Sequence, residues 1–335
     1  MKKVLFLGLV VLLVSCQGKR SEYHQNYNGG PALGTSYNIT YLAQEELDYQ
    51  KEIDSVFEVV NRSMSTYIPD SDISRINNGD TTVRVDQMFR EVFELSKEVH
   101  DQTDGYFDPT VGVLVNAWGF GPGEQITLDS TKVDSLLNYV GFSKVSLSED
   151  NRVMKKSHQI RFDFNAVAKG YAIDRLAVML DKKGISDYLV EVGGEIVAKG
   201  ENSLKGKPWS VGIEDPQKAE DRNLKATLNL KNRALASSGN YRKFRIDPAT
   251  GIKYVHTVDP KTGFTKNSNI LGVNILAKTC ARADAFATAF MAMDLEASMA
   301  VLEQQKDLDA YIIYLDEKGE AQEYITPGFS QVLIK

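Results

Sequence analysis

Apolar residues recur at intervals of three and four in five stretches of the chain, a spacing that places them on one face of a helix. In one of these, Asp86 stands where a cap is expected, and the helix it begins ends before Gly105. Its inward-facing residues are expected to be Phe89, Val92, Phe93, Ser96 and Val99. The other stretches predicted as helices are residues 45–63, 132–140, 165–183 and 283–293.

Runs of β-branched and aromatic residues predict strands, mostly in the second half of the chain. They cover residues 38–42, 188–198, 209–213, 226–236, 270–277 and 310–315. Helices and strands are mixed without the regular strand–helix–strand alternation that is typical of a parallel sheet. This order predicts the α+β class and one large domain of intertwined parts.

The composition is that of an ordinary folded protein. Of 335 residues, 42% are hydrophobic and 25% are charged, which excludes wholesale disorder. The net charge of −6 argues against a nucleic-acid binder with a broad basic face. Two cysteines, Cys16 and Cys280, provide no disulfide framework. The four histidines show no close His-x-x-x-His pairing, which argues against a classical zinc site.

The N-terminus has the features of a bacterial export signal. Two lysines precede an apolar run of eleven residues, 4–14, which is too short to span a bilayer but suits a signal peptide. The following Ser15 and Cys16 complete a sequence that resembles a lipobox. This predicts a signal peptide over residues 1–15, a lipidated Cys16, a flexible tether over 16–30 and one domain over 31–335. A plain signal peptide cleaved elsewhere is the alternative.

Two short segments near the start of the domain have only weak chemical signals. Leu33, Gly34 and Thr35 offer backbone N–H groups and a hydroxyl to a ligand, but an ordinary turn before a strand is the preferred explanation. Tyr67 follows the first predicted helix and suits stacking on a planar ring, but covering the core is the preferred role for it.

Residues 105–123 are rich in glycine, which favours a binding loop over a helix. Trp118 and Phe120 stand among these glycines, and such aromatic residues suit packing against a flat ligand. The segment neither follows a strand nor opens a helix, so a dinucleotide-binding Rossmann motif is rejected.

Residues 163–171 place Asp163 and several small residues at the expected start of a helix. A helix N-terminus favours phosphate, and Lys169 could assist there, whereas an N-cap is the simpler role for Asp163. The pair Gly193-Gly194 inside a strand pattern, just before Glu195, indicates a bulge or a close backbone approach.

Two further segments carry groups that suit catalysis and metal binding. His256 leads from a strand into a Pro-x-Thr-Gly turn, where functional residues concentrate, although a lone histidine is usually structural. Asp284 and Thr288 are four residues apart, so a helix places both side chains on one face. Such oxygen ligands suit Mg²⁺; an N-cap aspartate with a back-bonding threonine is the alternative.

Taken in order, these segments resemble the FAD:protein FMN transferase family, the ApbE-like flavin transferases, from about Leu33 to Met293. The motifs that carry the resemblance are Asp-Pro-Thr-Val-Gly, Trp-Gly-Phe-Gly, Ala-Lys-Gly-Tyr-Ala, Gly-Gly-Glu, Ser-Ser-Gly-Asn-Tyr, His-x-x-Asp-Pro-x-Thr-Gly and Ala-Asp-x-x-x-Thr. The resemblance implies an ApbE-like fold with intertwined subdomains and mixed, largely antiparallel sheets. It also implies Mg²⁺-dependent transfer of FMN from FAD, through a phosphoester bond, to a Ser or Thr hydroxyl, with release of AMP.

The resemblance also implies roles for individual residues. Contacts with FAD are implied for Leu33, Tyr67, Ala117, Trp118, Gly119, Asp163 and Val258, and Lys169 is also expected to contact FAD. The Mg²⁺ ligands would be the side chains of Asp284 and Thr288 and the backbone oxygen of Ala166. His256 would lie near the pyrophosphate, and either His256 or Asp284 would accept the proton of the attacking hydroxyl.

Three positions depart from the family pattern. Leu33 replaces the usual Met, and Asn165-Ala166 replaces the commoner Gly-Gly. Ala287 stands where some members have a second acidic ligand, which predicts a weaker metal site or a single ion. Cys280 has no identifiable cationic partner and is expected to be a small packing residue near the metal helix.

The same site would also serve two other activities. An FAD pyrophosphatase would use water as the acceptor, and a non-catalytic lipoprotein would only bind FAD. For a transferase, the expected partner is a flavoprotein with the motif Asp-x-x-(Ser/Thr)-Gly-Ala-(Ser/Thr), such as a subunit of a respiratory or electron-transfer complex. The lipid anchor predicts a place on a bacterial membrane in the cell envelope, facing the periplasm, and no nucleic acid is expected as a partner.

Overall fold

The computed structural model describes residues 23–217, 223–240, 244–246, 251, 253–266 and 268–334. The strands in these ranges are β1 (His24–Ala32), β2 (Thr35–Ala43), β3 (Val145–Leu147), β4 (Val153–Lys155), β5 (Asp187–Val192), β6 (Glu195–Lys199), β7 (Trp209–Glu214), β8 (Leu224–Leu230), β9 (Arg233–Gly239), β10 (Phe244–Ile246), β11 (Lys253–Val255), β12 (Ile270–Ala277), β13 (Asp309–Leu315) and β14 (Ala321–Ile325). The helices are α1 (Gln50–Met64), α2 (Asp72–Asn77), α3 (Gln87–Gln102), α4 (Gly112–Ala117), α5 (Ser130–Leu137), α6 (Ala168–Lys182), α7 (Cys280–Ala292), α8 (Leu295–Gln304) and α9 (Pro327–Ser330), with a short 3₁₀ turn at Phe142–Lys144.

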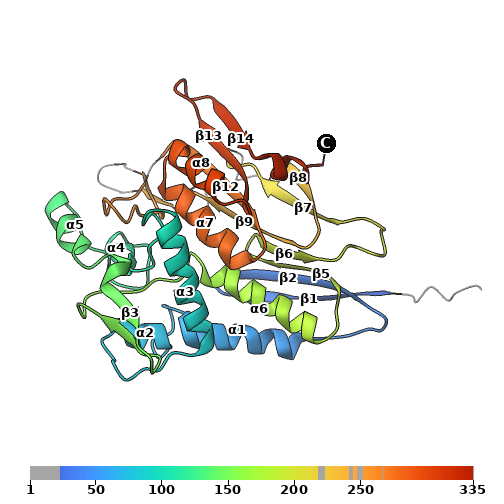
Figure 1. Ribbon diagram of the computed structural model, residues 1–335, viewed down its shortest axis with the longest axis horizontal. Helices are drawn as coiled ribbons and strands as arrows, with labels where there is room; N and C mark the ends of the chain where they lie inside the picture. The colour runs from blue at the N-terminus through green and yellow to red at the C-terminus, as the bar shows by residue number, and fades with distance from the viewer. Residues whose placement is uncertain are drawn as a thin grey trace, which may run out of the picture.

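One large sheet organises the described part of the chain. Its strand order is β1-β2-β5-β6-β9-β12-β13-β14, and every neighbouring pair is antiparallel. Helices α1, α6 and α7 lie across one face (Figure 1), and their buried side chains join those of the sheet in the main core. The hairpin of β7 and β8 and the short helix α9 pack on the opposite face in a second core. The predicted α+β class with largely antiparallel sheets is confirmed.

Helix α3 follows its sequence prediction closely. The Asp86 carboxylate accepts a hydrogen bond from the backbone N–H of Phe89 at 2.8 Å, which confirms the cap. All of the residues expected to face inward are buried: Phe89, Val92, Phe93, Ser96 and Val99. The other predicted helices are present with shifted ends. For example, α1 begins at Gln50 rather than at residue 45, and α7 begins at Cys280 rather than at residue 283.

Two predicted strands are each a pair of strands. The 188–198 prediction is wrong at Gly193 and Gly194, which have φ of 60° and 101° and form the tight turn between β5 and β6. Positive φ at both turn residues is the geometry that best fits the twist of a hairpin, and glycine adopts it without strain. Similarly, the 226–236 prediction spans the end of β8, a turn at Asn232 with φ of 54°, and β9.

Two segments predicted as irregular contain regular structure. The glycine-rich segment 105–123 includes helix α4, so its description as a loop without a helix is wrong. The tether predicted over 16–30 is also wrong from His24 onward, because β1 pairs with β2 along its whole length. The two buried asparagines of β1, Asn26 and Asn28, are hydrogen-bonded; Asn26 Oδ1, for example, accepts the Leu47 N–H at 2.7 Å.

The predicted signal peptide, the lipidated Cys16 and the tether up to residue 22 lie outside the described residues. Among the residues that are described, no helix has both the length and the apolar character needed to cross a membrane.

Candidate active site

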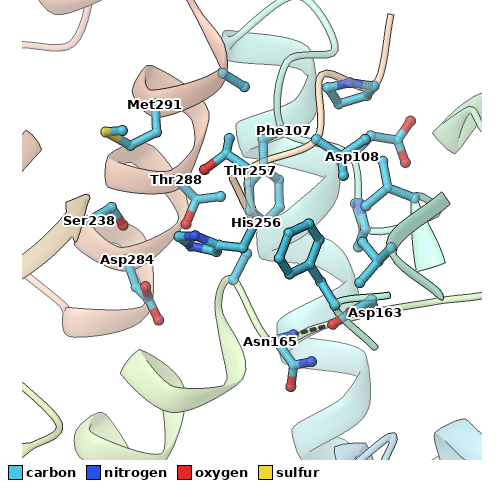
Figure 2. Close-up of a pocket in the computed structure, with 18 of the residues that line it drawn as sticks. Phe107, Asp108, Asp163, Asn165, Ser238, His256, Thr257, Asp284, Thr288 and Met291 are labelled. Atoms are coloured by element: carbon cyan, nitrogen blue, oxygen red, sulfur yellow. Dashed lines mark hydrogen bonds between the residues drawn. The ribbon is translucent and has the colours of Figure 1, made fainter. Parts of the chain in front are cut away.

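A cavity of about 300 Å³ lies where α6 and α7 meet the segments that follow α3 and β11. Most of the residues that the sequence marked as candidates line it: Asp163, Ala166, Lys169, His256, Val258, Asp284 and Thr288. Figure 2 shows Asp284 and Thr288 projecting from the same helix toward the space that His256 enters from the other side. The structure therefore brings together groups that are far apart in the sequence.

One side of this cavity is formed at the junction of α6 and α7, which we call the floor and define by Gly170, Asp174 and Asp284. Of these three residues, Asp284 lines the cavity itself. Asp284 lies inside α7 and is 4% exposed, so it is not the N-cap that the alternative prediction supposed. Its Oδ2 accepts a hydrogen bond from the backbone N–H of Gly170 at 3.1 Å. A Cβ on Gly170 would come within 2.5 Å of the Cys280 carbonyl oxygen, so only glycine allows this close crossing of the helices.

Asp174 fixes the start of α7 from the neighbouring helix. Its two carboxylate oxygens accept hydrogen bonds from the backbone N–H groups of Cys280 at 2.8 Å and Ala281 at 2.9 Å. The N-cap residue of α7, Thr279, makes no side-chain hydrogen bond to the helix. Asp174 of α6 therefore accepts from the first N–H groups of α7, which usually bond to a side chain next to them in the sequence. Burial raises the pKa of Asp174 to about 6, while the two N–H groups act in the opposite direction.

The charges around Asp284 favour the binding of a cation. Burial, and then the nearby Glu195 carboxylate, raise the pKa of Asp284 to about 8, and the Lys169 ammonium opposes this shift. Lys169 Nζ lies 2.7 Å from Glu195 Oε2, whose side chain is 3% exposed. Lys169, which is predicted to contact FAD, therefore forms an ion pair with Glu195. The sequence indicated Glu195 only as part of the Gly-Gly-Glu motif.

The donors in this cavity fit Mg²⁺. Asp284 offers a carboxylate, Thr288 a hydroxyl one helical turn later and Ala166 a backbone carbonyl. Mg²⁺ is usually held by one or two carboxylates together with water and substrate phosphates. Within the described residues, no group of three or more His, Cys, Asp or Glu side chains is placed to hold a metal. The site thus resembles a substrate-assisted Mg²⁺ site rather than a protein cage.

The opposite wall is the turn after β11, residues 256–265, which we call the rim turn. The Asp259 N–H donates to the Phe264 carbonyl at 2.9 Å, and the Gly263 N–H donates to the Asp259 carbonyl at 2.8 Å. Gly263 has φ of 74°, and a Cβ there would lie 2.6 Å from Val133 of α5. These contacts fix the turn that carries His256 and Val258 into the cavity.

Ala117, Trp118 and Gly119, which are predicted to contact FAD, are not among the residues that line the cavity. Of the three, Trp118 supports the rim turn. Trp118 Nε1 donates to the Gly263 carbonyl at 2.8 Å, and its ring lies 5.2 Å from that of Tyr254. The aromatic residues of the glycine-rich segment 105–123 that line the cavity are Tyr106, Phe107 and Phe120.

Tyr67 lies beside a neighbouring hollow of about 370 Å³, which Asp163 also lines. Asp163 therefore stands between the two spaces, where its Oδ1 accepts the Asn165 N–H at 2.8 Å (Figure 2). It does not cap α6, which begins at Ala168. Leu33 lies in the turn between β1 and β2 with φ of 50° and lines neither hollow.

Comparison with known proteins gives one consistent result. Residues 33–312 match the ApbE family. The FAD:protein FMN transferase of Vibrio cholerae serotype O1 is 34% identical over 98% of this chain and 98% of its own length. The Haemophilus influenzae protein of the same name is 31% identical over 94% and 93%. The solved flavin transferase ApbE from Vibrio cholerae superposes with a TM-score of 0.83 at 33% identity, covering 93% of this chain and all of that one.

Proposed function

The chain belongs to the ApbE family and is an enzyme that transfers FMN from FAD to a target protein, and we propose that this transfer takes place in the cavity between the floor and the rim turn. The observation that carries the proposal is the meeting of Asp284, Thr288 and Ala166 with His256 in one space. These are a metal-ligand set and a titratable base on opposite walls.

Asp284, Thr288 and the carbonyl oxygen of Ala166 would hold Mg²⁺ against the pyrophosphate of FAD. When bound, Mg²⁺ supplies positive charge that stabilises the phosphoryl oxygens as the bond to AMP breaks. The hydrogen bond from Gly170 orients the Asp284 carboxylate, and the Lys169–Glu195 pair fixes the charge beside it. Ala287, on the same helix, adds no second carboxylate, which supports a single ion.

The target's hydroxyl oxygen would form a bond to the phosphorus of the FMN half, and the bond from that phosphorus to the oxygen of AMP would break. The hydroxyl proton passes to His256 or to Asp284, and AMP leaves. The product is FMN in a phosphoester bond to Ser or Thr. Because the target supplies the nucleophile, the enzyme needs no activated serine or cysteine of its own.

Mass spectrometry of an acceptor domain tests this reaction. A domain with the motif Asp-x-x-(Ser/Thr)-Gly-Ala-(Ser/Thr), as in a respiratory or electron-transfer subunit, is incubated with FAD, Mg²⁺ and the enzyme from Tyr23 onward, which keeps β1 intact. We expect one added FMN on the Ser or Thr, lost with EDTA and in His256→Ala.

Two other results would contradict transfer. Free FMN and AMP with an unmodified acceptor would show a pyrophosphatase, and intact bound FAD would show a binding protein. Full transfer activity in His256→Ala would contradict the role proposed for His256 but not the transfer reaction itself.

We also propose that lipidated Cys16 anchors the enzyme to a bacterial membrane in the cell envelope, facing the periplasm. The support is the lipobox-like sequence and the preceding apolar run. Cys16→Ser should move the protein from the membrane fraction to the soluble fraction. Membrane attachment that survives this substitution would contradict the anchor.

A further inference from the structure

The outer side of the cavity has a contact to which the transfer reaction assigns no role. Lys261 Nζ lies 2.6 Å from Oδ2 of Asp104 and 4.1 Å from the centre of the Tyr106 ring. Lys261 belongs to the rim turn, whereas Asp104 and Tyr106 follow the end of α3. One ammonium group therefore joins two segments that are far apart in the sequence, through an ion pair and a cation–π contact.

This contact lies across a thin part of the cavity wall. Lys261 does not line the cavity, but its neighbour Pro260 does, and so does Tyr106. On the outer side, Asp104, Pro260 and Lys261 line a separate hollow of about 390 Å³. Pro260 and Asp108 line both spaces, so one layer of side chains separates the cavity from the outer hollow.

Two of the contacts that hold the rim turn differ greatly in strength. The inner anchor is Gly263, which accepts the Trp118 hydrogen bond and packs closely against α5. The outer anchor is Lys261, whose partner Asp104 has a side chain that is 94% exposed. Exposed ion pairs are weak and are screened by salt, so the outer anchor opens far more readily than the inner one.

We propose that Lys261 is a positioning residue that holds Pro260 against Tyr106 and thereby slows the escape of bound FAD. The inference rests on the proposed function in taking FAD as the ligand of the cavity. With the contact made, the wall between the two spaces stays closed. When the contact breaks, Pro260 loses its outer anchor and keeps only the hydrogen bonds within the turn and the anchor at Gly263. The outer hollow then becomes a route out of the cavity.

Stopped-flow flavin fluorescence of FAD release, in the absence of acceptor, tests the proposal. Lys261→Met keeps the aliphatic stem and removes the charge. We expect FAD to dissociate about three- to tenfold faster and KM for FAD to rise similarly, with kcat changed less than about twofold. Lys261→Arg should restore the wild-type rate, because a guanidinium also pairs with carboxylates and stacks on aromatic rings.

Two further comparisons separate positioning from a general loss of stability. Asp104→Asn tolerates the φ of 49° at this position and should speed release by less than Lys261→Met. Lys231→Met is the matched control, since Lys231 also makes an exposed ion pair, with Glu201 at 3.1 Å, and lines neither space. Raising NaCl from about 50 to about 500 mM should bring the wild-type release rate closer to that of Lys261→Met.

Unchanged release in Lys261→Met, or an equal change in Lys231→Met, would overturn the role of Lys261 while leaving the transferase intact. A wild-type enzyme that binds no FAD would instead overturn the proposed function, and this inference with it.

Discussion

The floor and the rim turn form opposite walls of one cavity and are stabilised in opposite ways. The floor is buried, and its contacts join the backbone of one helix to the side chains or backbone of the other. The rim turn combines one buried anchor, Gly263, with the exposed anchor Lys261. A buried charge whose hydrogen bonds are satisfied is costly to disturb, whereas an exposed pair opens at little cost.

This difference matches what each wall has to do. Metal ligands act only within a narrow geometry, so the metal-binding role proposed for Asp284 and Ala166 requires a rigid support. A large dinucleotide must enter and AMP must leave, so part of the opposite wall has to yield. In the proposed mechanism the floor fixes the geometry of the metal ligands, and the rim turn lets FAD enter and AMP leave. Substitutions on the two walls should therefore change different kinetic constants.

The largest effect is expected on the floor, from Asp284→Asn. Transfer should fall at least about a hundredfold, because the amide has no charge to hold Mg²⁺. The same substitution should make the metal-free protein more stable at alkaline pH. A loss of activity together with a gain of stability is expected if this carboxylate is buried to bind metal and not to stabilise the fold.

The sign of the stability change follows from the pKa of Asp284, which rises in the folded state from 3.8 to about 8. The folded protein holds this proton up to about pH 8, whereas the unfolded chain loses it near pH 4. The free energy of unfolding of the metal-free wild type therefore falls as pH rises across this interval.

Urea unfolding in EDTA at about pH 6.5 and about pH 8 measures how the free energy of unfolding changes with pH. Both pH values lie above the pKa of Asp174, which is raised to about 6, so Asp174 contributes little to the difference. The slope should be smaller in Asp284→Asn. A wild-type slope in the variant would contradict the prediction.

A smaller effect on the same wall is expected from Asp174→Asn. The amide can accept only one of the two N–H groups at the start of α7 and points its own donor at the other. We expect a loss of about 1–3 kcal/mol in the free energy of unfolding and a weaker affinity for Mg²⁺. Calorimetry with and without Mg²⁺ measures both.

Asp181→Asn is the matched control on α6, because Asp181 is 40% exposed and the amide oxygen can still accept from both Lys199 and Tyr188. It should cost less than about 1 kcal/mol and leave Mg²⁺ affinity unchanged. Equal losses in the two variants would show that Asp174 has no special place in the floor.

The comparison also shows what could be predicted from the sequence. Helix α3 was predictable because cap and apolar spacing are local signals, and Asp284 and Thr288 were predictable as neighbours on one face of a helix. The junction of α6 and α7 could not be predicted in the same way. Asp174 caps a helix that begins 106 positions later, and no local spacing marks such a contact.

Local signals also misled where tertiary contacts supply the partners. The polar start of the domain has the composition of a tether, yet β1 forms because β2 and the loop before α1 satisfy its polar groups. The contact of Trp118 with FAD stays a prediction; the structure shows its indole bound to the Gly263 carbonyl of the rim turn. The motifs marked segments that surround the cavity, but only the fold shows which side chains line it.

Trp118→Phe carries the smallest expected effect and tests the inner anchor of the rim turn. It removes the donor to the Gly263 carbonyl and should lower the free energy of unfolding by about 1 kcal/mol. Trp209→Phe is its matched control, because that indole also donates to a carbonyl, that of Lys199, at 2.9 Å, but on the other face of the sheet. Both variants should lose similar stability in urea unfolding. Only Trp118→Phe should raise KM for FAD, by about twofold, because only it loosens the wall that carries His256; an equal KM in the two variants would mean that the inner anchor supports the fold alone.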